Sequence, residues 1–246
     1  MNILINQKNI SKIYKNFLGH KLQALHEVNL DIEEGEFFVL LGPSGCGKST
    51  LLRIMSGLDS NFTGSQTYIE GLDKKDFSFV FQQFALLPWL TIEENISIGL
   101  IAKGKLTKEN KKNVEEIIKS LGLEKFAKEY PKELSGGMKQ RVGIARALAI
   151  NPKIIFLDEP FSALDSFTAK ILREELLAMW REKKMTIVMV THNTEEAIQL
   201  GSRIGVMSSR PGKIDEIIMN TLPRPRGLRS EEFFKLVDKI ETLIKV

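Results

Sequence analysis

The stretch VLLGPSGCGKSTLLRIM, residues Val39–Met55, decides the fold. Within it, Gly42–Ser49 matches the pattern G-x-x-x-x-G-K-S/T. A strand-length apolar run precedes this pattern and an amphipathic helical pattern follows it, which is the context that a phosphate-binding loop requires. Glycines let backbone N–H groups turn inward around a phosphate, and a helix start adds partial positive charge. The stretch therefore predicts a phosphate loop in an α/β core, rather than a glycine-rich turn alone.

The side chains of this loop have separate expected roles. Lys48 reaches the β- and γ-phosphates of a nucleotide as a point charge, and Ser49 ligates Mg²⁺ with Thr50 beside it. Cys46 is interpreted as a small side chain and not as a redox centre. The predicted nucleotide-binding residues of the loop are Gly42, Pro43, Ser44, Gly45, Cys46, Gly47, Lys48, Ser49 and Thr50.

A pair of carboxylates follows a second apolar run, in the stretch NPKIIFLDEP. Ile154–Leu157 reads as a buried strand that ends in Asp158 and Glu159. A carboxylate at the end of such a strand, next to a phosphate loop, is where Mg²⁺ is held, so Asp158 is the expected metal ligand, through water. Glu159 lies one residue further and is expected to polarise the attacking water. The alternative is a strand-end turn with two solvated acids.

Composition limits the class of protein. The chain has 246 residues, of which 43% are hydrophobic, so a sizeable core can form. The single cysteine fits a reducing compartment, and the longest apolar runs have strand length, so we expect a soluble, cytoplasmic protein. The net charge is +4, but the acidic and basic residues are interspersed, and we expect no binding to nucleic acid.

The order of patterns along the chain predicts one α/β domain. Four short apolar runs read as strands of a parallel sheet, with helical patterns between them, such as residues 166–184. Residues 214–219 read as a further short strand after the turn Arg210-Pro211-Gly212. The predicted strands are Phe37–Leu41, Phe77–Phe81, Ile154–Leu157 and Thr186–Val190. The predicted segments of the domain are an antiparallel β layer plus phosphate loop (1–75), a helical subdomain (88–150), the rest of the α/β core (151–222) and a C-terminal tail helix (223–246).

Four motifs in a fixed order carry a family resemblance. After the phosphate loop come LSGGM (Leu134–Met138), IIFLDEP and SALD (Ser162–Asp165). This set, which extends over nearly the whole chain, resembles the ATPase subunit of an ATP-binding-cassette (ABC) transporter. The resemblance implies a P-loop NTPase core of the ABC ATPase kind with an antiparallel β subdomain and a helical subdomain, and it implies ATP and Mg²⁺ as ligands.

The resemblance also implies a head-to-tail dimer. In that family, the signature motif of one subunit closes over the γ-phosphate held by the phosphate loop of the other. Ser135, Gly136 and Gly137 are therefore expected to donate to the ATP of a second copy of the chain. A Gly-Gly helix start supplies N–H groups and dipole charge for an anion. Met138 departs from the glutamine that is commoner at this position, which weakens one polar contact but not the backbone contacts.

The same resemblance implies roles for two further residues, Gln82 and Asp165. Gln82, in FVFQQF, matches the glutamine that contacts Mg²⁺ and water, and Gln83 is its neighbouring competitor. Asp165 matches the aspartate that links the sites of the two subunits.

Two more side chains match residues around the nucleotide. His192 follows an apolar strand pattern and matches the switch histidine near the γ-phosphate. Tyr14 matches the aromatic residue that stacks on adenine, with Phe17 as an alternative. The implied catalytic residues are Glu159, His192 and Lys48.

A loop and a tail suggest the kind of transporter. Phe84–Ile96 is apolar and loop-like, and reads either as core or as a groove for a coupling helix of a membrane permease. Three segments of the chain, ALLPWLT, RPGKI and LPRPR, are similar to segments of the importer ATPases for nitrate, sulfonate and taurine. Thiamine-precursor importers have similar sequences in these segments. The implied partners are a second copy, a transmembrane permease and, indirectly, a solute-binding protein, at the inner face of the cell membrane.

Two other classes of protein fit less well. A cassette ATPase that acts on nucleic acid or the ribosome would be expected to carry a coiled coil or a second cassette, and neither pattern is present in the sequence. A P-loop GTPase or small-molecule kinase would not carry the signature motif. The sequence also has no Asn-Lys-x-Asp motif for reading guanine.

Overall fold

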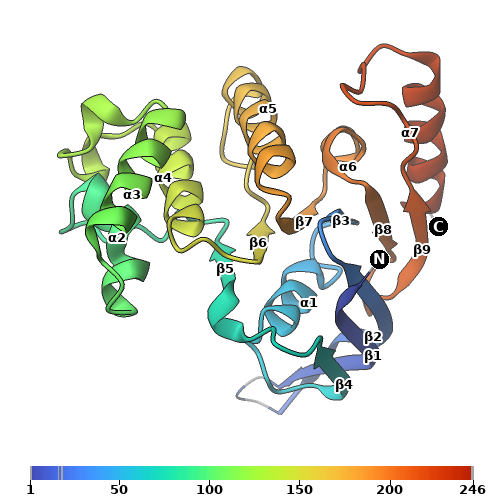
Figure 1. Cartoon of the computed structure of the whole chain (residues 1–246). Coiled ribbons are helices and arrows are strands. Elements are labelled where there is room, and N and C mark those ends of the chain that lie inside the picture. Colours follow the sequence, from blue (N-terminus) through green and yellow to red (C-terminus); the bar gives the residue numbers. More distant parts are fainter. Residues whose placement is uncertain (1, 16, 18, 245–246) are drawn as a thin grey trace. The chain divides into compact units, whose positions relative to one another are not determined.

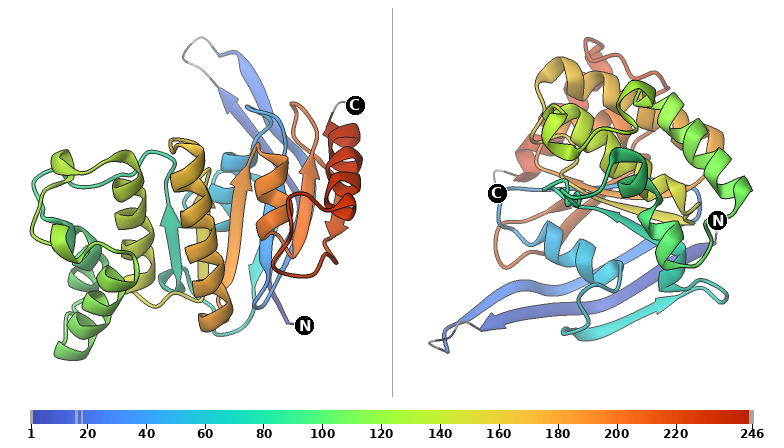
Figure 2. Two further views of the ribbon diagram at one scale, coloured as in Figure 1. Left: turned by 90° about the horizontal axis from the view of Figure 1, so that it is seen from above. Right: turned by 90° about the vertical axis from the view of Figure 1, so that its left-hand side faces the viewer.

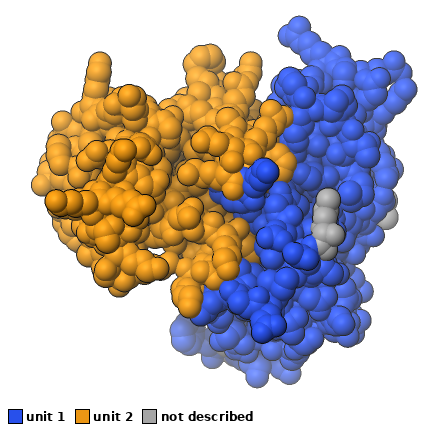
Figure 3. Space-filling view, viewed as in Figure 1, with its two compact units in different colours: residues 1–74, 184–246 blue, residues 75–183 orange. Residues whose placement is uncertain are grey.

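The computed structural model of the chain describes residues 2–15, 17 and 19–244. The chain divides into two compact units, which Figure 3 draws in different colours. Unit 1 comprises Met1–Lys74 and Lys184–Val246, and unit 2 comprises Lys75–Lys183. The chain therefore leaves unit 1 after the phosphate loop, completes unit 2, and returns.

The first layer of unit 1 is built on buried parallel strands. Strand β3 (Phe37–Leu41) pairs in parallel with β7 (Thr186–Thr191) on one side and with β8 (Arg203–Met207) on the other. Every residue of β3 and β7 is buried, as expected where both faces of a parallel sheet are covered. The edge strand β9 (Ile214–Met219) runs antiparallel to β8. These elements confirm the strands expected at residues 37–41, 186–190 and 214–219.

The second layer of unit 1 is an antiparallel sheet with the order β2-β1-β4. Its strands are β1 (Ile3–Lys15), β2 (Lys21–Glu33) and β4 (Thr63–Tyr68). Helix α1 (Lys48–Met55) lies along this sheet (Figure 2). Side chains of β4 reach the last turn of α1, since the Gln66 Nε2 and the Tyr68 hydroxyl donate to the carbonyls of Ile54 and Met55 at 3.0 and 3.1 Å.

A basic segment closes unit 1 at its C-terminal side. Helix α6 (Thr194–Leu200) ends at carbonyls that accept hydrogen bonds from two arginines of the LPRPR segment. Arg226 donates to the carbonyls of Ile198 and Gly201, both at 2.7 Å, and Arg224 donates to that of Leu200 at 2.6 Å. Cations are favourable at a helix C-terminus, so these contacts stabilise α6. Helix α7 (Glu231–Ile244) then packs against α6 and β8 (Figure 1).

Unit 2 combines a parallel strand pair with a group of helices. Strand β5 (Phe77–Val80) pairs in parallel with β6 (Ile154–Asp158), which confirms the two strands expected here. Helices α2, α3 and α4 pack on one another. The helices are α2 (Ile92–Ala102), α3 (Lys108–Ser120), α4 (Gly136–Ala149) and α5 (Ser166–Lys183); short 3-10 turns occupy Lys74–Asp76, Glu124–Phe126 and Pro131–Glu133. Across the part of the chain that the structure describes, no helix has both the length and the apolar character to cross a membrane.

Candidate active site

The loop between β3 and α1 has the backbone of an anion cradle. Gly45 and Gly47 have φ values of +79° and +109°, in the left-handed region that favours glycine. A Cβ on Gly47 would lie 2.7 Å from the carbonyl oxygen of Ala24, so the loop also needs glycine there for space. The first residues of a helix have N–H groups without an acceptor in the same helix, and α1 begins at Lys48. The loop therefore directs N–H groups and helix-dipole charge at one place.

Lys48 brings a buried positive charge to this loop. Lys48 is 4% exposed, and its ammonium donates to the carbonyls of Gly42 at 2.8 Å and Pro43 at 2.9 Å. Two carbonyl dipoles do not neutralise a full charge, and a buried charge is costly until it is paired. An anionic phosphate is therefore the ligand that this side chain favours.

Cys46 lies inside the loop and is 1% exposed. Burial raises the pKa of its thiol above the ordinary value, although the charges of Lys48 and Arg210 act in the opposite direction. Since the thiolate is the reactive form of cysteine, this environment supports the interpretation of Cys46 as a small packing side chain.

Tyr14 lies beside the helix that follows the loop. Its hydroxyl is 3.3 Å from the Thr50 hydroxyl, and the Lys12 ammonium lies 4.9 Å from the centre of its ring. The side chain is 39% exposed, so an aromatic surface is available next to α1. The alternative residue, Phe17, is fully exposed.

His192 is exposed and immediately follows β7. The turn around it is fixed by Thr191, whose hydroxyl donates to the Glu196 carboxylate at 2.7 Å and accepts from the Asn193 N–H at 3.1 Å. Asn193 caps α6 by accepting from the N–H of Glu196. The position of His192 is thus set by hydrogen bonds on both sides of it.

In unit 2, a glutamine contacts the second carboxylate of the pair. Asp158 is the last residue of β6 and is 2% exposed, and Glu159 follows it at partial exposure. Gln82 Nε2 donates to the Glu159 carboxylate at 3.3 Å, although the two residues are 77 positions apart. Glu159 also has a φ of +45°, which is costly for a residue with a side chain. Such conformations are often found at functional sites.

The LSGGM stretch begins helix α4. Ser135 is its N-cap, and its hydroxyl oxygen accepts from the N–H of Met138 at 3.3 Å. Gly136 and Gly137 form the first turn, where N–H groups have no helical acceptor. A Cβ on Gly137 would approach the Thr168 methyl group to 2.5 Å, so the helix start packs closely against the region that follows SALD.

Asp165 caps the helix next to the signature. Its carboxylate accepts from the N–H groups of Phe167 at 3.1 Å and Thr168 at 3.0 Å. Hydrogen bonds from Thr168 are the main reason why the pKa of Asp165 lies below its ordinary value. Thr168 therefore contacts both Asp165 and the position of Gly137, and joins the signature to the SALD turn.

Two residues that sequence reasoning missed hold the loop after Gln82. Arg146 of α4 donates to the carbonyls of Ala85 at 2.6 Å and Phe84 at 3.1 Å. Asn95 is fully buried, accepts from the N–H of Leu87 at 2.8 Å, and donates to nearby carbonyls of the same loop. The only signals in the sequence were a polar residue on the apolar face of each helical pattern. Trp89, in the loop that they hold, is 69% exposed and so is not part of the core.

The sequence-predicted residues come together in two groups, one in each unit. In unit 1, the phosphate loop, Tyr14 and Thr50 are neighbours, and His192 ends a strand adjacent to β3. In unit 2, Gln82 meets Glu159 beside Asp158, and the signature meets the SALD turn. The contact with Glu159 favours Gln82 over Gln83.

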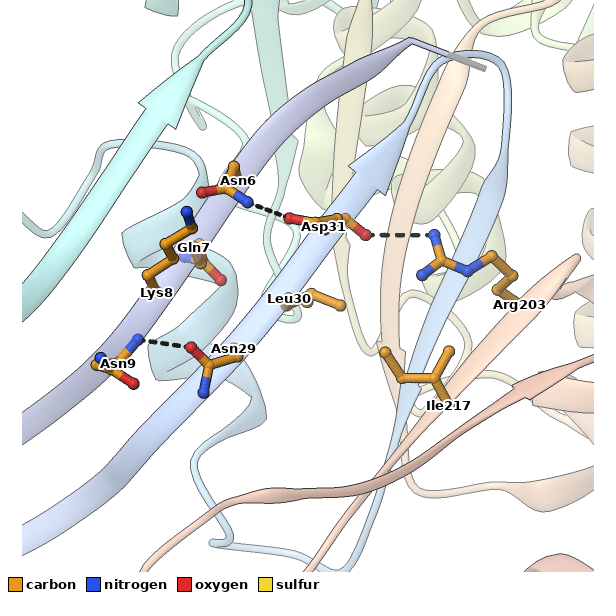
Figure 4. Close-up of a pocket in the computed structure, with 9 residues that line it drawn as sticks. All are labelled: Asn6, Gln7, Lys8, Asn9, Asn29, Leu30, Asp31, Arg203 and Ile217. Carbon is orange, nitrogen blue, oxygen red and sulfur yellow. Dashed lines mark hydrogen bonds between the residues drawn. The ribbon is translucent and has the colours of Figure 1, made fainter.

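A separate pocket of about 320 Å³ lies in unit 1 (Figure 4). It is lined by residues of β1, β2, β8 and β9, and contains none of the predicted site residues. Its polar groups bond to one another: Asn6 donates to the Asp31 carboxylate, the Asn9 N–H donates to Asn29 at 2.9 Å, and Arg203 donates to the Asp31 carbonyl at 3.3 Å. These hydrogen bonds join β1 to β2 and β2 to β8.

Comparison with known proteins places this geometry in a family. A model of the family "ABC transporter" matches residues 25–162. The aliphatic sulfonates import ATP-binding protein SsuB of Bacillus cereus is 47% identical over 244 residues, covering 98% of this chain and 94% of that protein. The nitrate import ATP-binding protein NrtD of Synechocystis is 40% identical, with 96% and 94% covered. The chain belongs to the ABC transporter family.

A solved structure supports the same assignment. The dimeric ATP-binding cassette MJ0796, in a post-hydrolysis state bound to ADP and Pi, matches with a TM-score of 0.77 and 39% identity, over 88% of this chain and 99% of that one. The predicted fold, a P-loop core with antiparallel β and helical subdomains, is confirmed, and so is the prediction that the chain is an ATPase of this family.

Proposed function

We propose that the chain is the ATP-hydrolysing subunit of an importer that takes up a small anion. The observation that carries this proposal is the presence, in one chain, of a glycine-built phosphate loop and a second glycine helix start at Gly136-Gly137. Sulfonate and nitrate importer subunits are among its relatives over nearly the whole chain, which supports an anionic solute such as a sulfonate, taurine or nitrate.

In unit 1, the proposed role is to bind ATP. The loop Gly42–Thr50 would surround the phosphates, with Lys48 neutralising charge on the β- and γ-phosphates, and Tyr14 would stack on the adenine. His192 would contact the γ-phosphate. The left-handed glycines, the buried ammonium and the exposed ring next to Thr50 fit these roles.

In unit 2, the proposed role is to hydrolyse ATP. Glu159 would accept a proton from water as the water attacks the γ-phosphorus, and the bond to the leaving β-phosphate oxygen would break to give ADP and phosphate. A general base of this kind contributes about 10²–10⁴ in rate. Gln82 and Asp158 would hold Mg²⁺, for which amide and carboxylate oxygens are suitable ligands. That ion would neutralise charge on the phosphates.

Two copies are proposed to act together. Ser135, Gly136 and Gly137 of one copy would close over the ATP bound by the phosphate loop of the other, and Asp165 would contact the partner near this junction. The structure of MJ0796 as a dimer supports this arrangement. Closure and reopening would drive a membrane permease, and the chain would then lie at the inner face of the membrane. A separate solute-binding protein would select the solute.

The segment Phe84–Ile96, a loop that runs into the first turns of α2, is the proposed contact with the permease. Trp89 is 69% exposed in it, and Arg146 and Asn95 hold its backbone. The loop starts two residues after Gln82, so a change at the nucleotide would reach it directly.

Purification from native membranes tests the proposal. Tagged wild-type protein is extracted in mild detergent and the proteins that accompany it are identified by mass spectrometry. We expect a multi-span permease and a solute-binding protein whose affinity for sulfonates, taurine and nitrate is then measured. Trp89→Ala should lose the permease, whereas Phe234→Ala, an exposed aromatic in α7, should retain it. Ribosomal or DNA-bound proteins in place of a permease would refute the proposal.

A further inference from the structure

The connection between β8 and β9 lies against the phosphate loop within unit 1. It begins after Met207 and is closed at its base, where the Ser208 N–H donates to the Lys213 carbonyl at 3.0 Å and the Lys213 N–H donates to the Ser208 hydroxyl at 3.1 Å. The RPG turn, Arg210-Pro211-Gly212, forms the tip of this connection. Its position is thus defined by β8 and β9.

Gly212 anchors the RPG turn to strand β2. Its N–H donates to the Ala24 carbonyl and its carbonyl accepts from the His26 N–H, both at 3.0 Å. A Cβ on Gly212 would lie 2.0 Å from the carbonyl oxygen of Cys46, a distance that backbone atoms cannot accommodate. The turn is therefore in direct contact with the middle of the phosphate loop, and glycine permits this approach.

Arg210 forms the polar part of the contact. Its Nε and Nη2 atoms donate to the carbonyl oxygen of Gly45 at 3.0 and 2.7 Å. Gly45 has a φ of +79°, which permits this orientation of its peptide group. A guanidinium is planar and always charged, so it fixes the direction of the carbonyl more firmly than a neutral donor would.

The direction of this carbonyl decides the direction of an N–H group. The peptide bond between Gly45 and Cys46 is trans and planar, so the N–H of Cys46 points away from the carbonyl that Arg210 holds. That N–H is 3.4 Å from the Pro43 carbonyl, across the phosphate loop, which is a long and weak hydrogen bond. It is therefore directed into the loop and can be given up to a stronger acceptor.

We propose that Arg210 is a positioning residue that holds the Gly45–Cys46 peptide with its N–H directed at the bound phosphates, and so strengthens the binding of ATP. This inference rests on the proposed binding of ATP at the phosphate loop. Arg210 acts through the backbone of the loop, because its guanidinium lies on the carbonyl side of the Gly45–Cys46 peptide. The set of residues proposed to shape the phosphate loop thus extends to a segment 165 positions further along the chain.

The test compares ATP binding by wild type and four variants, one of which is a control. The dissociation constant of MgATP, and kcat and KM for hydrolysis, are measured for wild type, Arg210→Ala, Arg210→Lys and Lys48→Ala. We expect Arg210→Ala to raise both Kd and KM about 10-fold with kcat within about 2-fold, and Arg210→Lys to lie between it and wild type. Arg229→Ala is the control, because it removes the same charge from an exposed position in unit 1 and should bind ATP as wild type does.

Each outcome decides a separate question. If Arg210→Ala binds MgATP as tightly as wild type while Lys48→Ala does not, the inference is wrong and the proposed ATP site stands. If wild type does not bind MgATP, or binds it no better than Lys48→Ala, the ATP site itself is wrong and the inference falls with it. A fall in kcat equal to the loss of affinity, with a lower melting temperature in the absence of nucleotide, would show a general structural role and would also overturn the inference.

Discussion

The side-chain amide of Gln82 donates a hydrogen bond of 3.3 Å to the carboxylate of Glu159. One partner follows β5 and the other follows β6, and these two strands run parallel, so their carboxyl ends meet at one edge. The proposed metal-contacting glutamine and the proposed general base therefore share a hydrogen bond. A change at either residue should alter hydrolysis more than binding.

Replacement of Gln82 by alanine should lower the rate of hydrolysis. The change removes the donor that orients Glu159 and a proposed contact to Mg²⁺, so we expect kcat to fall about 10-fold or more with a KM for ATP within about 3-fold. Gln83→Ala is the matched control, since it removes the same group one residue away. A larger loss of kcat in Gln83→Ala than in Gln82→Ala would mean that Gln83, and not Gln82, has this role.

The variant Glu159→Gly should be a more stable protein than the variant Glu159→Ala. The φ of +45° at Glu159 lies in the left-handed region, where a Cβ costs roughly 1–2 kcal/mol, partly offset by the greater freedom of glycine when unfolded. We expect Glu159→Gly to exceed Glu159→Ala by about 0.5–1 kcal/mol in the free energy of unfolding, measured in urea. At Glu174, exposed within α5, the order should reverse. Equal stabilities at position 159 would argue against strain there.

Arg226 should stabilise unit 1 through the end of α6. Its guanidinium donates to several carbonyls, including those of Ile198 and Gly201, and hydrogen bonds from charged groups contribute about 1.5–3 kcal/mol. Arg226→Ala should therefore lower the free energy of unfolding by roughly 2 kcal/mol. Arg229→Ala, at a nearby exposed position, should change it by less than about 0.5 kcal/mol. Similar losses in both variants would contradict the role of these carbonyl contacts.

Glu36 should make stability depend on pH. Burial raises the pKa of this carboxyl to about 7, even though the Glu33 N–H donates to it at 2.6 Å and Arg203 lies 3.2 Å away. The native protein therefore keeps a proton that the unfolded chain releases with a pKa of 4.5. The contribution is complete below about pH 4.5 and is lost as the pH rises through about 7, by roughly 3 kcal/mol.

The variant Glu36→Gln isolates this contribution. Its free energy of unfolding should lack the decline that wild type shows between about pH 4.5 and 7, because the amide does not titrate. Urea titrations at several pH values measure the difference in slope between the two proteins. Parallel slopes over this window would mean that the Glu36 carboxyl keeps its ordinary pKa in the folded state.

Local patterns were sufficient to predict much of the fold. The phosphate loop is one continuous segment whose glycines, lysine and flanking strand and helix all lie within Val39–Met55, so its structure could be expected from the sequence. The strands at residues 37–41, 154–158 and 186–191 were also recognisable, because parallel strands covered on both faces are continuously apolar. The strand at residues 77–80 was recognisable from its apolar run as well, although its two central residues are only partly buried.

Long-range contacts could not be predicted in the same way. Arg146 holds a loop 61 residues away, and Arg210 holds the phosphate loop from 165 residues away. No periodic pattern marks such side chains, because their partners are backbone carbonyls, which every residue carries. The positive φ of Glu159 was also unexpected, since it depends on how β6 ends and not on the residue type.

The oligomeric state of Glu159→Gln with ATP tests the central claim most directly. If two copies close around ATP held between the phosphate loop of one and the signature of the other, loss of the general base should leave the closed state trapped. We expect light scattering to show twice the monomer mass at saturating MgATP, and the monomer mass without nucleotide or when Lys48→Ala is added. A Glu159→Gln protein that stays monomeric at saturating MgATP would contradict the account.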